Sequence, residues 1–184
     1  MIKILRIGEI CEILDKYRKP ITKKYRVTGN IPYYGATGIV DWVDKYIFDE
    51  TLVLVGEDGA KWASGERTAF IIEGKSWVNN HVHVLRPDLS LVTHKWLAYF
   101  LTSIDLSPWV TGLTVPKLNQ AQLCSIKVLL PSLDEQNRIV NKLDDIFCEI
   151  DKGIQSCKDQ IENYRQLKSC LLSKEFQKKS ELYY

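Results

Sequence analysis

The stretch that decides the fold is Pro131 to Leu171, PSLDEQNRIVNKLDDIFCEIDKGIQSCKDQIENYRQLKSCL, in the last third of a chain of 184 residues. Ser132, followed three residues later by Glu135, has the form of a capping box, which marks the start of a helix. The acidic side chains of Asp134 and Glu135 suit the positive end of the helix dipole. We therefore predict one long helix that begins at about residue 132.

Apolar side chains recur along this stretch at steps of three and four residues, about 3.6 on average. Such a stripe is typical of a helix that packs against another helix. Two successive steps of four, at Ile150 and Ile154, form a stutter, which keeps the local packing closer to straight. The side chains expected at the interface are Ile139, Leu143, Ile146, Ile150, Ile154, Ile161, Tyr164 and Leu171, with Cys157 and Leu167 between them.

The length of the predicted helix implies a partner. Forty helical residues extend roughly 60 Å, whereas a compact domain of about 131 residues has a radius of gyration of about 14 Å. That domain is too small to cover the whole apolar stripe, so we expect another helix beside it. One alternative stays open. The helix could turn near Gly153 and pack on itself, because glycine weakens a helix interior.

The residues before the helix have the pattern of a compact α+β domain with short strands. Apolar runs bounded by turn residues predict strands at residues 52–55, 69–72, 77–85 and 126–130. Residues 94–102 have helical spacing, and residues 2–13 fit either a strand or a short helix. Residues 16–30 and 31–40 contain prolines and glycines and indicate loops, the second leading into a strand. We place the domain boundaries at 1–131 and 132–184.

The composition is that of a folded protein that is not exported. Apolar residues make up 45% of the chain and charged residues 26%. No apolar run approaches the roughly 18 residues that a membrane span needs, and the first ten residues lack the core of a signal peptide. Five cysteines without a CxxC pair favour free thiols in a reducing compartment. We therefore expect a cytoplasmic protein with no membrane segment.

Basic residues are unevenly distributed, although the formal net charge is only +2. Within residues 16–26 no acid occurs, and six residues are basic: Lys16, Arg18, Lys19, Lys23, Lys24 and Arg26. Such a cluster can contact the phosphates of a nucleic acid. It can equally be a solvated loop, and charge alone does not separate the two interpretations.

A metal site is not favoured by the histidines. His81 and His83 form an HxH pair, which a strand would point to one face. A zinc site needs two further ligands, and His94 is the only other histidine in the chain. We therefore predict no metal site and interpret these histidines as structural.

An enzyme is not favoured either. Glu57, Asp58 and Lys61, with Asp44 or Asp49, could in principle bind magnesium and activate water. However, three residues separate Glu57 from Lys61 where such nucleases usually have one, and a tight turn explains Asp58-Gly59. A P-loop, a GxGxxG fingerprint and a GxSxG elbow are all absent from the sequence. We predict no catalytic residue and no cofactor, which leaves recognition of DNA or of a protein.

Four segments, in this order and spacing, give the chain a resemblance to a known family. They are IPYYGATGIV at 31–40, LVGEDGA at 54–60, NHVHVL at 80–85, and LPSLDEQ at 130–136 with the long helix that follows. With these segments the chain resembles the specificity (S) subunit of type I restriction–modification systems. The resemblance extends over nearly the whole chain.

The resemblance implies a target-recognition domain that reads one half of a split site in double-stranded DNA, and a long helix that acts as a spacer. It also implies docking to methyltransferase (M) subunits and, in the full complex, to a restriction (R) subunit. A full-length S subunit has two such domains and two such helices, whereas this chain has one of each. We therefore expect a half S subunit, complete at both ends, that forms a homodimer through an antiparallel coiled coil. Such a dimer should read a bipartite, palindromic site.

Residue types suggest which side chains contact DNA. We expect phosphate contacts from Lys23, Lys24 and Arg26, and contacts nearer the groove from Tyr33, Tyr34, Lys61, Trp62 and Lys117. For the three aromatic residues the alternative is core packing. Asn80, His81, Glu135 and Gln136 have the character of turn and cap residues. For the whole chain, two alternatives stay open: a silent or truncated S-subunit fragment, and, less favoured, a stand-alone magnesium-dependent nuclease.

Overall fold

The structure is a computed structural model that describes residues 2–180, with side chains in the last helix described as far as Phe176. The chain divides into two compact units, Met1–Val140 (unit 1) and Asn141–Tyr184 (unit 2). The strands are β1 (Lys3–Arg6), β2 (Cys11–Ile13), β3 (Ile31–Gly35), β4 (Gly38–Val43), β5 (Phe48–Asp49), β6 (Leu52–Gly56), β7 (Ala69–Ile72), β8 (Lys75–Val78), β9 (Val82–Pro87) and β10 (Lys127–Leu130). The α-helices are α1 (Ile7–Ile10), α2 (His94–Ser103), α3 (Gln120–Ser125) and α4 (Leu133–Ser180), and the short 3₁₀ turns are η1 (Asp15–Tyr17), η2 (Lys23–Tyr25) and η3 (Ser107–Trp109).

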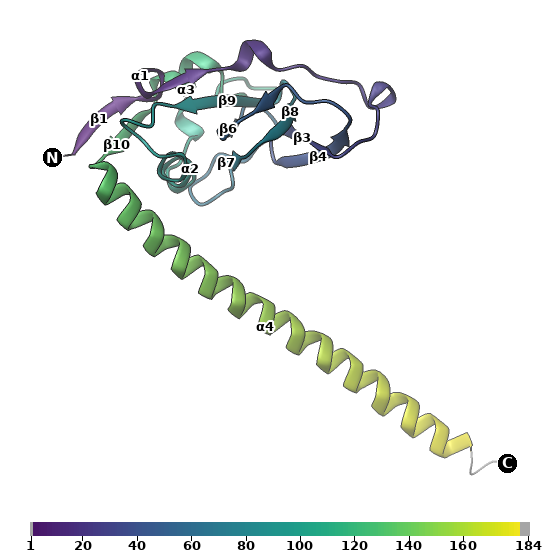
Figure 1. Cartoon of the computed structure of the whole chain (residues 1–184). Helices are drawn as coiled ribbons and strands as arrows, with labels where there is room; N and C mark the ends of the chain where they lie inside the picture. Colours follow the sequence, from purple (N-terminus) through teal and green to yellow (C-terminus); the bar gives the residue numbers. More distant parts are fainter. Residues whose placement is uncertain (1, 181–184) are drawn as a thin grey trace. The chain divides into compact units, whose positions relative to one another are not determined.

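Within residues 2–140 the strands form three sheets (Figure 1). The central sheet has the order β2-β9-β6-β7, the second has the order β4-β3-β8-β5, and β1 pairs with β10. All neighbouring strands are antiparallel except β3 and β8, which run parallel. In the central sheet Val53 of β6 lies opposite Leu85 of β9 and Ile71 of β7.

Strand β6 separates two hydrophobic cores. All five of its residues are buried, because elements cover both faces of the strand. Val53 and Val55 face a core that includes residues of α1, α2 and α3. Leu52 and Leu54 face a second core, together with side chains of β5 and β8. A strand that is covered on both sides has a continuous apolar sequence, which is why LVLV is recognisable.

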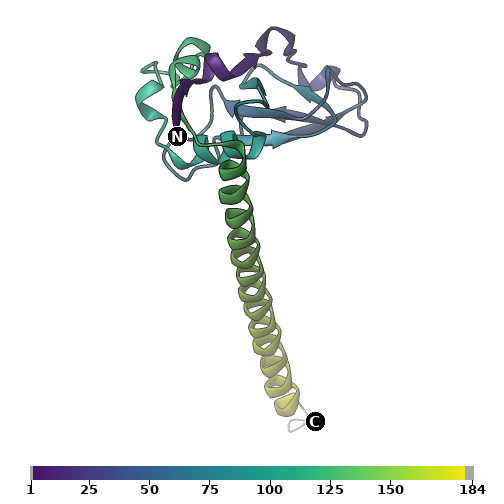
Figure 2. The same cartoon turned by 60° about the vertical axis from the view of Figure 1, so that its left-hand side comes forward.

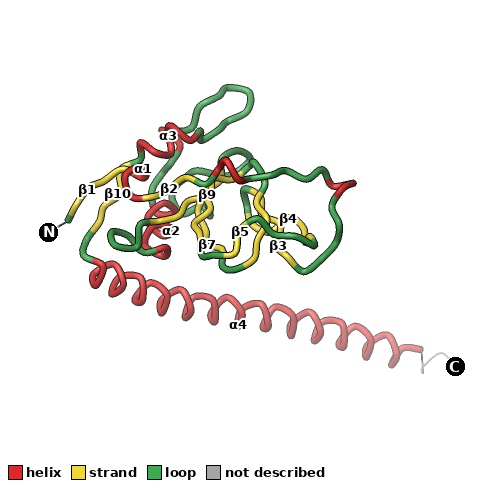
Figure 3. Tube along the Cα trace, turned by 45° about the horizontal axis from the view of Figure 1, so that its top comes forward, coloured by secondary structure: helices red, strands yellow, loops and turns green. Residues whose placement is uncertain are grey.

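Helices pack on the core that Val53 and Val55 face. Thr93 caps α2, because its Oγ1 accepts the Trp96 N–H at 3.2 Å. Leu97, Ala98 and Leu101 of α2 are buried. Helices α1 and α3 lie side by side where β1 pairs with β10 (Figure 3).

Helix α4 has 48 residues and continues through Gly153 without a break (Figure 2). The alternative of a hairpin near Gly153 is therefore wrong. Ser132 Oγ accepts the Glu135 N–H at 3.3 Å, which confirms the predicted cap. The second half of the capping box is not formed, because the Glu135 carboxylate binds the Arg138 guanidinium at 2.7 Å instead.

The first two turns of α4 belong to unit 1. Gln136 and Val140 are 0% and 3% exposed. Gln136 Nε2 donates to the carbonyls of Leu91 (2.9 Å) and Pro131 (3.1 Å), and Gln136 Oε1 accepts the Thr93 N–H (3.0 Å). Unit 1 thus extends past the predicted boundary at residue 131, because these turns are packed and hydrogen-bonded to it.

Several predicted elements are confirmed. Strands β6, β7 and β10 and helix α2 lie where the apolar patterns placed them. Residues 2–13, for which a strand and a short helix both fitted, contain β1, α1 and β2. In these segments the spacing of the apolar residues in the sequence matches the side chains that are buried in the structure.

Two predicted elements are wrong. Residues 77–85 are not one strand, because Asn79 Oδ1 accepts the His81 N–H at 2.8 Å and the resulting turn separates β8 from β9. Residues 31–40 are not a loop but the β3–β4 hairpin. Its turn needs a left-handed backbone at Gly38, with φ of +121°, which glycine adopts readily.

The predicted interface stripe lies on α4, and from Ile146 onward its apolar members are exposed by 43% or more. The antiparallel coiled coil stays a prediction. None of the helices within residues 2–180 combines the length and the apolar character needed to cross a membrane.

Replacing Gln136 by alanine is expected to lower the free energy of unfolding of unit 1 by about 3 kcal/mol, because three part-buried backbone groups lose their hydrogen-bond partner. Urea denaturation followed by far-UV circular dichroism measures the change. Gln166→Ala, at an exposed position of α4, is the control and should change stability by less than about 0.5 kcal/mol. Equal losses in the two variants would contradict the role given to Gln136.

Candidate nucleic-acid interface

The basic segment 16–26 separates into internal arginines and external lysines. Arg18 and Arg26 are partly buried, whereas Lys16, Lys19, Lys23 and Lys24 are exposed. Short 3₁₀ turns at η1 and η2 hold the segment, and the Trp77 indole donates to the Lys19 carbonyl at 2.6 Å. Hydrogen bonds therefore hold this segment on the rest of unit 1, so it is not a freely solvated loop.

Arg26 supports the surface instead of facing outward. Its Nη1 lies 2.8 Å from Asp41 Oδ2, and its guanidinium lies 4.4 Å from the centre of the Tyr33 ring. The hydrogen bond from Arg26 lowers the pKa of Asp41. Tyr33 is 1% exposed, and its hydroxyl accepts the Ile21 N–H at 3.0 Å. The expected contact between Tyr33 and a DNA groove is therefore wrong for this conformation, and the core-packing alternative holds.

The four lysines face outward, and two of them lie over tyrosine rings. Lys16 Nζ is 4.9 Å from the Tyr17 ring centre, and Lys24 Nζ is 4.7 Å from that of Tyr25. Both tyrosines are exposed. Among the described residues no close ion pair involves Lys16, Lys19, Lys23 or Lys24, so their charges face solvent. We call these four lysines with Tyr17 and Tyr25 the lysine–tyrosine row.

The other predicted DNA contacts differ in exposure. Tyr34 packs against the second core, its ring 6.1 Å from that of Phe70, and burial raises its pKa. Trp62 packs against the first core and donates from Nε1 to the Gly56 carbonyl at 3.3 Å. Lys61 is mostly exposed, and its Nζ lies 3.6 Å from Glu66.

Lys117 closes the base of an exposed loop. Its backbone N–H donates to the Thr111 carbonyl at 2.7 Å, and the Thr111 N–H donates to the Lys117 carbonyl at 2.9 Å. Leu113 and Val115, between them, are exposed. Lys117 Nζ lies 2.8 Å from Glu57 Oε1, so its charge is already paired within unit 1.

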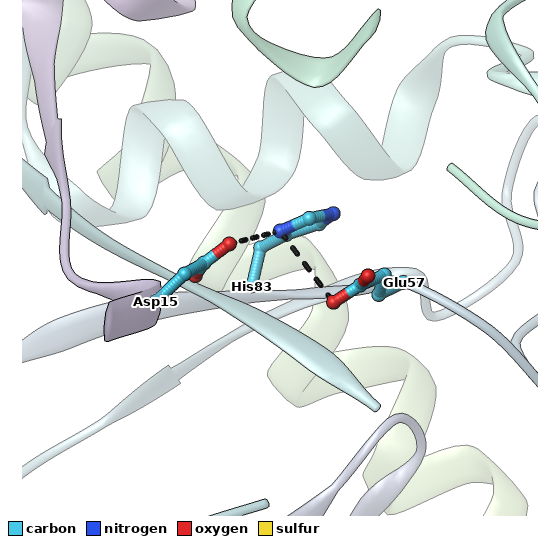
Figure 4. Close-up of side chains that lie close together, drawn as sticks. All are labelled: Asp15, Glu57 and His83. Carbon is cyan, nitrogen blue, oxygen red and sulfur yellow. Dashed lines mark hydrogen bonds and ion pairs between the residues drawn. The ribbon is translucent and has the colours of Figure 1, made fainter. Parts of the chain in front are cut away.

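Asp15, Glu57 and His83 lie close together in a largely buried cluster of charges (Figure 4). His83 Nδ1 lies 2.5 Å from Asp15 Oδ2 and 3.9 Å from Glu57 Oε2. Arg18 Nη1 binds Glu57 and also donates to the Val82 carbonyl at 2.9 Å, while Arg18 Nη2 lies 3.3 Å from Asp15. The cluster connects η1, the ends of β6 and β9, and the loop at Lys117.

The ligand types in this cluster are those of a metal site, since Asp15, Glu57 and His83 place one ligand atom each within 4.8 Å of one another. Each carboxylate oxygen, however, already has a donor. Asp15 Oδ1 accepts the Val84 N–H at 2.8 Å, and both oxygens of Glu57 bind cations. We interpret the group as a structural ion cluster, because a metal would have to displace Arg18 and Lys117.

The electrostatics of Glu57 follow from these contacts. Burial acts to raise the pKa of Glu57, but hydrogen bonds from Lys117 and Arg18 outweigh it and the net shift is downward. The hydrogen bond that Lys117 donates to Glu57 in turn raises the pKa of Lys117. Lys61, the lysine of the alternative nuclease interpretation, pairs with Glu66, and both oxygens of Glu57 bind cations of the cluster.

Sequence patterns missed the cluster. Arg18 and Glu57 are 39 residues apart, and Asp15 and His83 are 68 apart, so no short motif contains them. The HxH pair was a signal, but its two rings have different roles. His83 in β9 is buried, whereas His81 lies in the preceding turn, where its ring binds Asp58 at 2.6 Å.

Known sequences match most of the chain. Residues 2–163 match the family described as the type I restriction modification DNA specificity domain. A putative type I restriction enzyme specificity subunit of Haemophilus influenzae is 37% identical over 138 residues. The match covers 75% of this chain and 35% of that protein. The chain thus spans about a third of the length of the curated relative that it matches.

Known structures show the same fold. The S subunit of a type I restriction–modification system from M. genitalium superposes with a TM-score of 0.64 at 16% identity, covering 81% of this chain and 39% of that one. The HsdS subunit of Thermoanaerobacter tengcongensis gives 0.56 at 22% identity, with 81% and 38% covered. This chain therefore corresponds in length to less than half of either subunit.

Replacing Glu57 by glutamine should reduce the free energy of unfolding by about 3 kcal/mol at pH 7, because two cations lose a partly buried partner. The pKa of Glu57 is lowered in the folded state, so its stabilisation is present above the unfolded value of about 4.3 and is lost as pH falls through the folded value. The difference between wild type and variant should therefore shrink between pH 5 and pH 3, in urea titrations at each pH.

Glu66→Gln is the matched control, since it removes a carboxylate from an exposed pair with Lys61. It should change stability by less than about 1 kcal/mol at any pH. A loss at Glu57→Gln that stayed the same from pH 7 to pH 3 would contradict the ionic origin of the effect.

Proposed function

The chain belongs to the type I restriction–modification DNA specificity family, and on this premise we propose that it is a DNA sequence-recognition subunit of such a system. The observation that carries this proposal is the lysine–tyrosine row, whose cations face solvent and form no close ion pair among the described residues. In this proposal the chain catalyses no reaction. It reads DNA, and methyltransferase subunits that dock on it supply the methyl transfer.

The row has the chemistry of a DNA backbone contact. Lysine ammonium groups neutralise phosphates and release counterions, which favours binding. Tyrosine hydroxyls beside them can donate to phosphate oxygens. Because η1 and η2 hold the segment against unit 1, fewer side-chain arrangements are lost on binding than in a free loop.

The predicted DNA contacts fall into two groups in this proposal. Lys23 and Lys24, in η2, contact phosphate directly, and Lys61 adds a further exposed charge. Arg26 and Tyr33 act through packing, because they fix the chain on either side of η2. Lys117 positions the loop 111–117 through Glu57. That loop and Trp62 are our candidates for contacts with the DNA groove.

The proposed assembly is a homodimer through α4. The exposed stripe from Ile146 to Leu171 loses contact with water only when another helix covers it, and burial of each large apolar side chain contributes about 1.5–3 kcal/mol. The site read by such a dimer is bipartite and palindromic, because a twofold assembly reads the same bases twice.

Charge along α4 favours an antiparallel pair. Residues 133–156 hold six acids and three bases, and residues 157–180 hold three acids and six bases. The two halves therefore carry formal charges of −3 and +3. An antiparallel partner places opposite charges side by side, whereas a parallel partner places like charges together.

Two other functions are less well supported. A silent fragment of an S subunit would fold in the same way and fail to assemble with methyltransferase subunits. Co-purification with the methyltransferase encoded in the same genome, followed by mapping of methylated sites, separates this case from the leading one. A stand-alone nuclease is disfavoured by the cations that bind Glu57.

The double variant Lys23→Ala/Lys24→Ala should weaken binding to duplex DNA by about tenfold near 0.1 M salt, and the slope of log affinity against log salt should fall by about 2. Fluorescence anisotropy with a labelled duplex gives both quantities. Lys3→Ala/Lys127→Ala removes the same charge from the β1–β10 pair and is the control. If the two variants lost affinity equally, net charge alone would explain the result.

Ile150→Asp/Ile154→Asp should convert the dimer to a monomer at micromolar concentration, since two carboxylates would be buried in an apolar interface. Sedimentation velocity measures the distribution. Gln155→Asp/Gln166→Asp adds the same charge on the opposite face of α4 and should leave the dimer intact. A wild-type chain that sediments as a monomer would contradict the assembly outright.

A further inference from the structure

The loop 111–117 presents apolar side chains to solvent. Residues 111–116 are all exposed, and Leu113 and Val115 are 105% and 64% exposed. A leucine in this position gains nothing from folding, because its apolar surface stays in contact with water. The packing of unit 1 therefore does not explain an apolar residue at the tip of the loop, and a partner that covers it would.

The backbone of the loop is fixed at its base and in its turn. Two hydrogen bonds of 2.7 and 2.9 Å join the backbones of Thr111 and Lys117. Gly112 has a φ of +97°, which glycine adopts readily, and a Cβ at this position would lie 2.4 Å from the Val115 carbonyl oxygen. Pro116 fixes its own φ and restricts the residue before it. The loop thus holds Leu113 in a defined position.

The base of the loop lies beside the basic segment, because one carboxylate binds both. Glu57 Oε1 lies 2.8 Å from Lys117 Nζ, and Glu57 Oε2 binds Arg18 Nη1. The Leu118 N–H also donates to the Glu57 carbonyl at 2.8 Å. These contacts fix the position of the loop relative to the basic segment.

A histidine ring makes a second link between the two. His83 Nδ1 lies 2.5 Å from Asp15 Oδ2, and His83 Nε2 lies 2.7 Å from the Leu118 carbonyl oxygen. Lys16 and Tyr17 of the lysine–tyrosine row follow Asp15 in η1. The apolar tip therefore stands close to charges that face solvent. A partner that covers both must combine anionic and apolar surface, as duplex DNA does with its phosphates and bases.

The residue types in the loop favour insertion over the reading of base edges. Residues 112–116 are Gly-Leu-Thr-Val-Pro, without the Arg, Lys, Asn or Gln that pair with base edges through two hydrogen bonds. Leucine and proline are instead among the side chains that minor-groove proteins insert between base steps. Leu113 follows Thr111 by two residues, so the backbone can carry it roughly 7 Å from the base of the loop. The minor groove is about 7.5 Å deep, which this reach matches.

We propose that Leu113 inserts between adjacent base pairs from the minor groove while the lysine–tyrosine row holds nearby phosphates. This inference rests on the proposed DNA-recognition function and adds to it a wedge that deforms the duplex. Insertion unstacks one base step and bends the DNA toward the major groove. TA and CA/TG steps unstack most easily. The wedge therefore selects a flexible step without a hydrogen bond to any base edge.

Fluorescence of 2-aminopurine tests the insertion directly, because this base becomes brighter when it loses its stacked neighbour. The probe is a short duplex that the wild-type chain enriches from a random pool, with 2-aminopurine in place of each adenine in turn. We expect the full-length chain to raise the fluorescence at one step of each half-site by about threefold. Leu113→Ser should abolish the increase and weaken binding by about tenfold, whereas Leu113→Phe, which keeps a wedge side chain, should retain both.

Two further variants separate the wedge from a general effect of mutation. Leu89→Ser is the matched control, because Leu89 is a leucine of unit 1 that is 56% exposed and lies outside the loop. It should leave fluorescence and affinity unchanged. Gly112→Ala keeps Leu113 but displaces the turn, so it should lose most of the fluorescence increase. Since Leu113 is fully exposed, the circular dichroism spectrum of Leu113→Ser should match that of the wild type.

The possible outcomes distinguish this inference from the function on which it rests. A wild-type chain that binds the duplex and brightens no position would overturn the wedge and leave DNA recognition in place. The same holds if Leu113→Ser brightens the wild-type position equally. A Leu113→Ser variant that keeps its DNA binding and fluorescence but no longer co-purifies with the methyltransferase would make the loop a protein contact instead. A chain that enriches no duplex would overturn the proposed function and this inference together.

Discussion

The ion pair between Arg18 and Glu57 fixes the basic segment 16–26 on the rest of unit 1. Glu57 follows the fully buried strand β6, so its position is set by the packing of two cores. Through Arg18 it holds the basic segment, and through Lys117 it holds the loop 111–117. Asp15 and His83 complete the cluster from the other side. Because a charge that loses its partner in such a place costs several kcal/mol, the segment and the loop keep one arrangement.

Within the eleven residues of the basic segment, the arginines are partly buried and the lysines are exposed. The planar guanidinium groups of Arg18 and Arg26 bind carboxylates and an aromatic ring inside the surface, which suits their fixed geometry. The lysines stay at the outside, where a flexible stem and a hydrated ammonium group meet a charged partner such as phosphate. A cluster that looks uniform in sequence thus has an internal half, the arginines, that supports the surface and an exposed half, the lysines, that we propose binds DNA. This division also explains why Tyr33 is buried, since it packs under Arg26.

Helix α4 imposes the second constraint. Its apolar stripe is long, and the part of it beyond unit 1 is exposed, which is why we propose that another helix covers it. The formal charges of its two halves, −3 and +3, favour an antiparallel partner in the dimer that we propose. In that proposed dimer the apolar stripe contributes affinity and the charges determine the relative direction of the two helices. A DNA-reading unit at each end is then held at a fixed distance.

The sequence by itself determined the elements with strong local periodicity. The helix from residue 133, its cap at Ser132, the buried strand β6 and helix α2 were all predicted, because their apolar spacing and capping residues lie within a few positions of one another. The sequence also indicated the family, through short segments in a fixed order. The tertiary structure alone decided that residues 31–40 form a hairpin, that Tyr33 is buried, and that Arg18 and Asp15 join Glu57 and His83. For the charge cluster the physical reason is sequence separation: its contacts link residues up to 68 positions apart, and only the packing of the sheets brings them together.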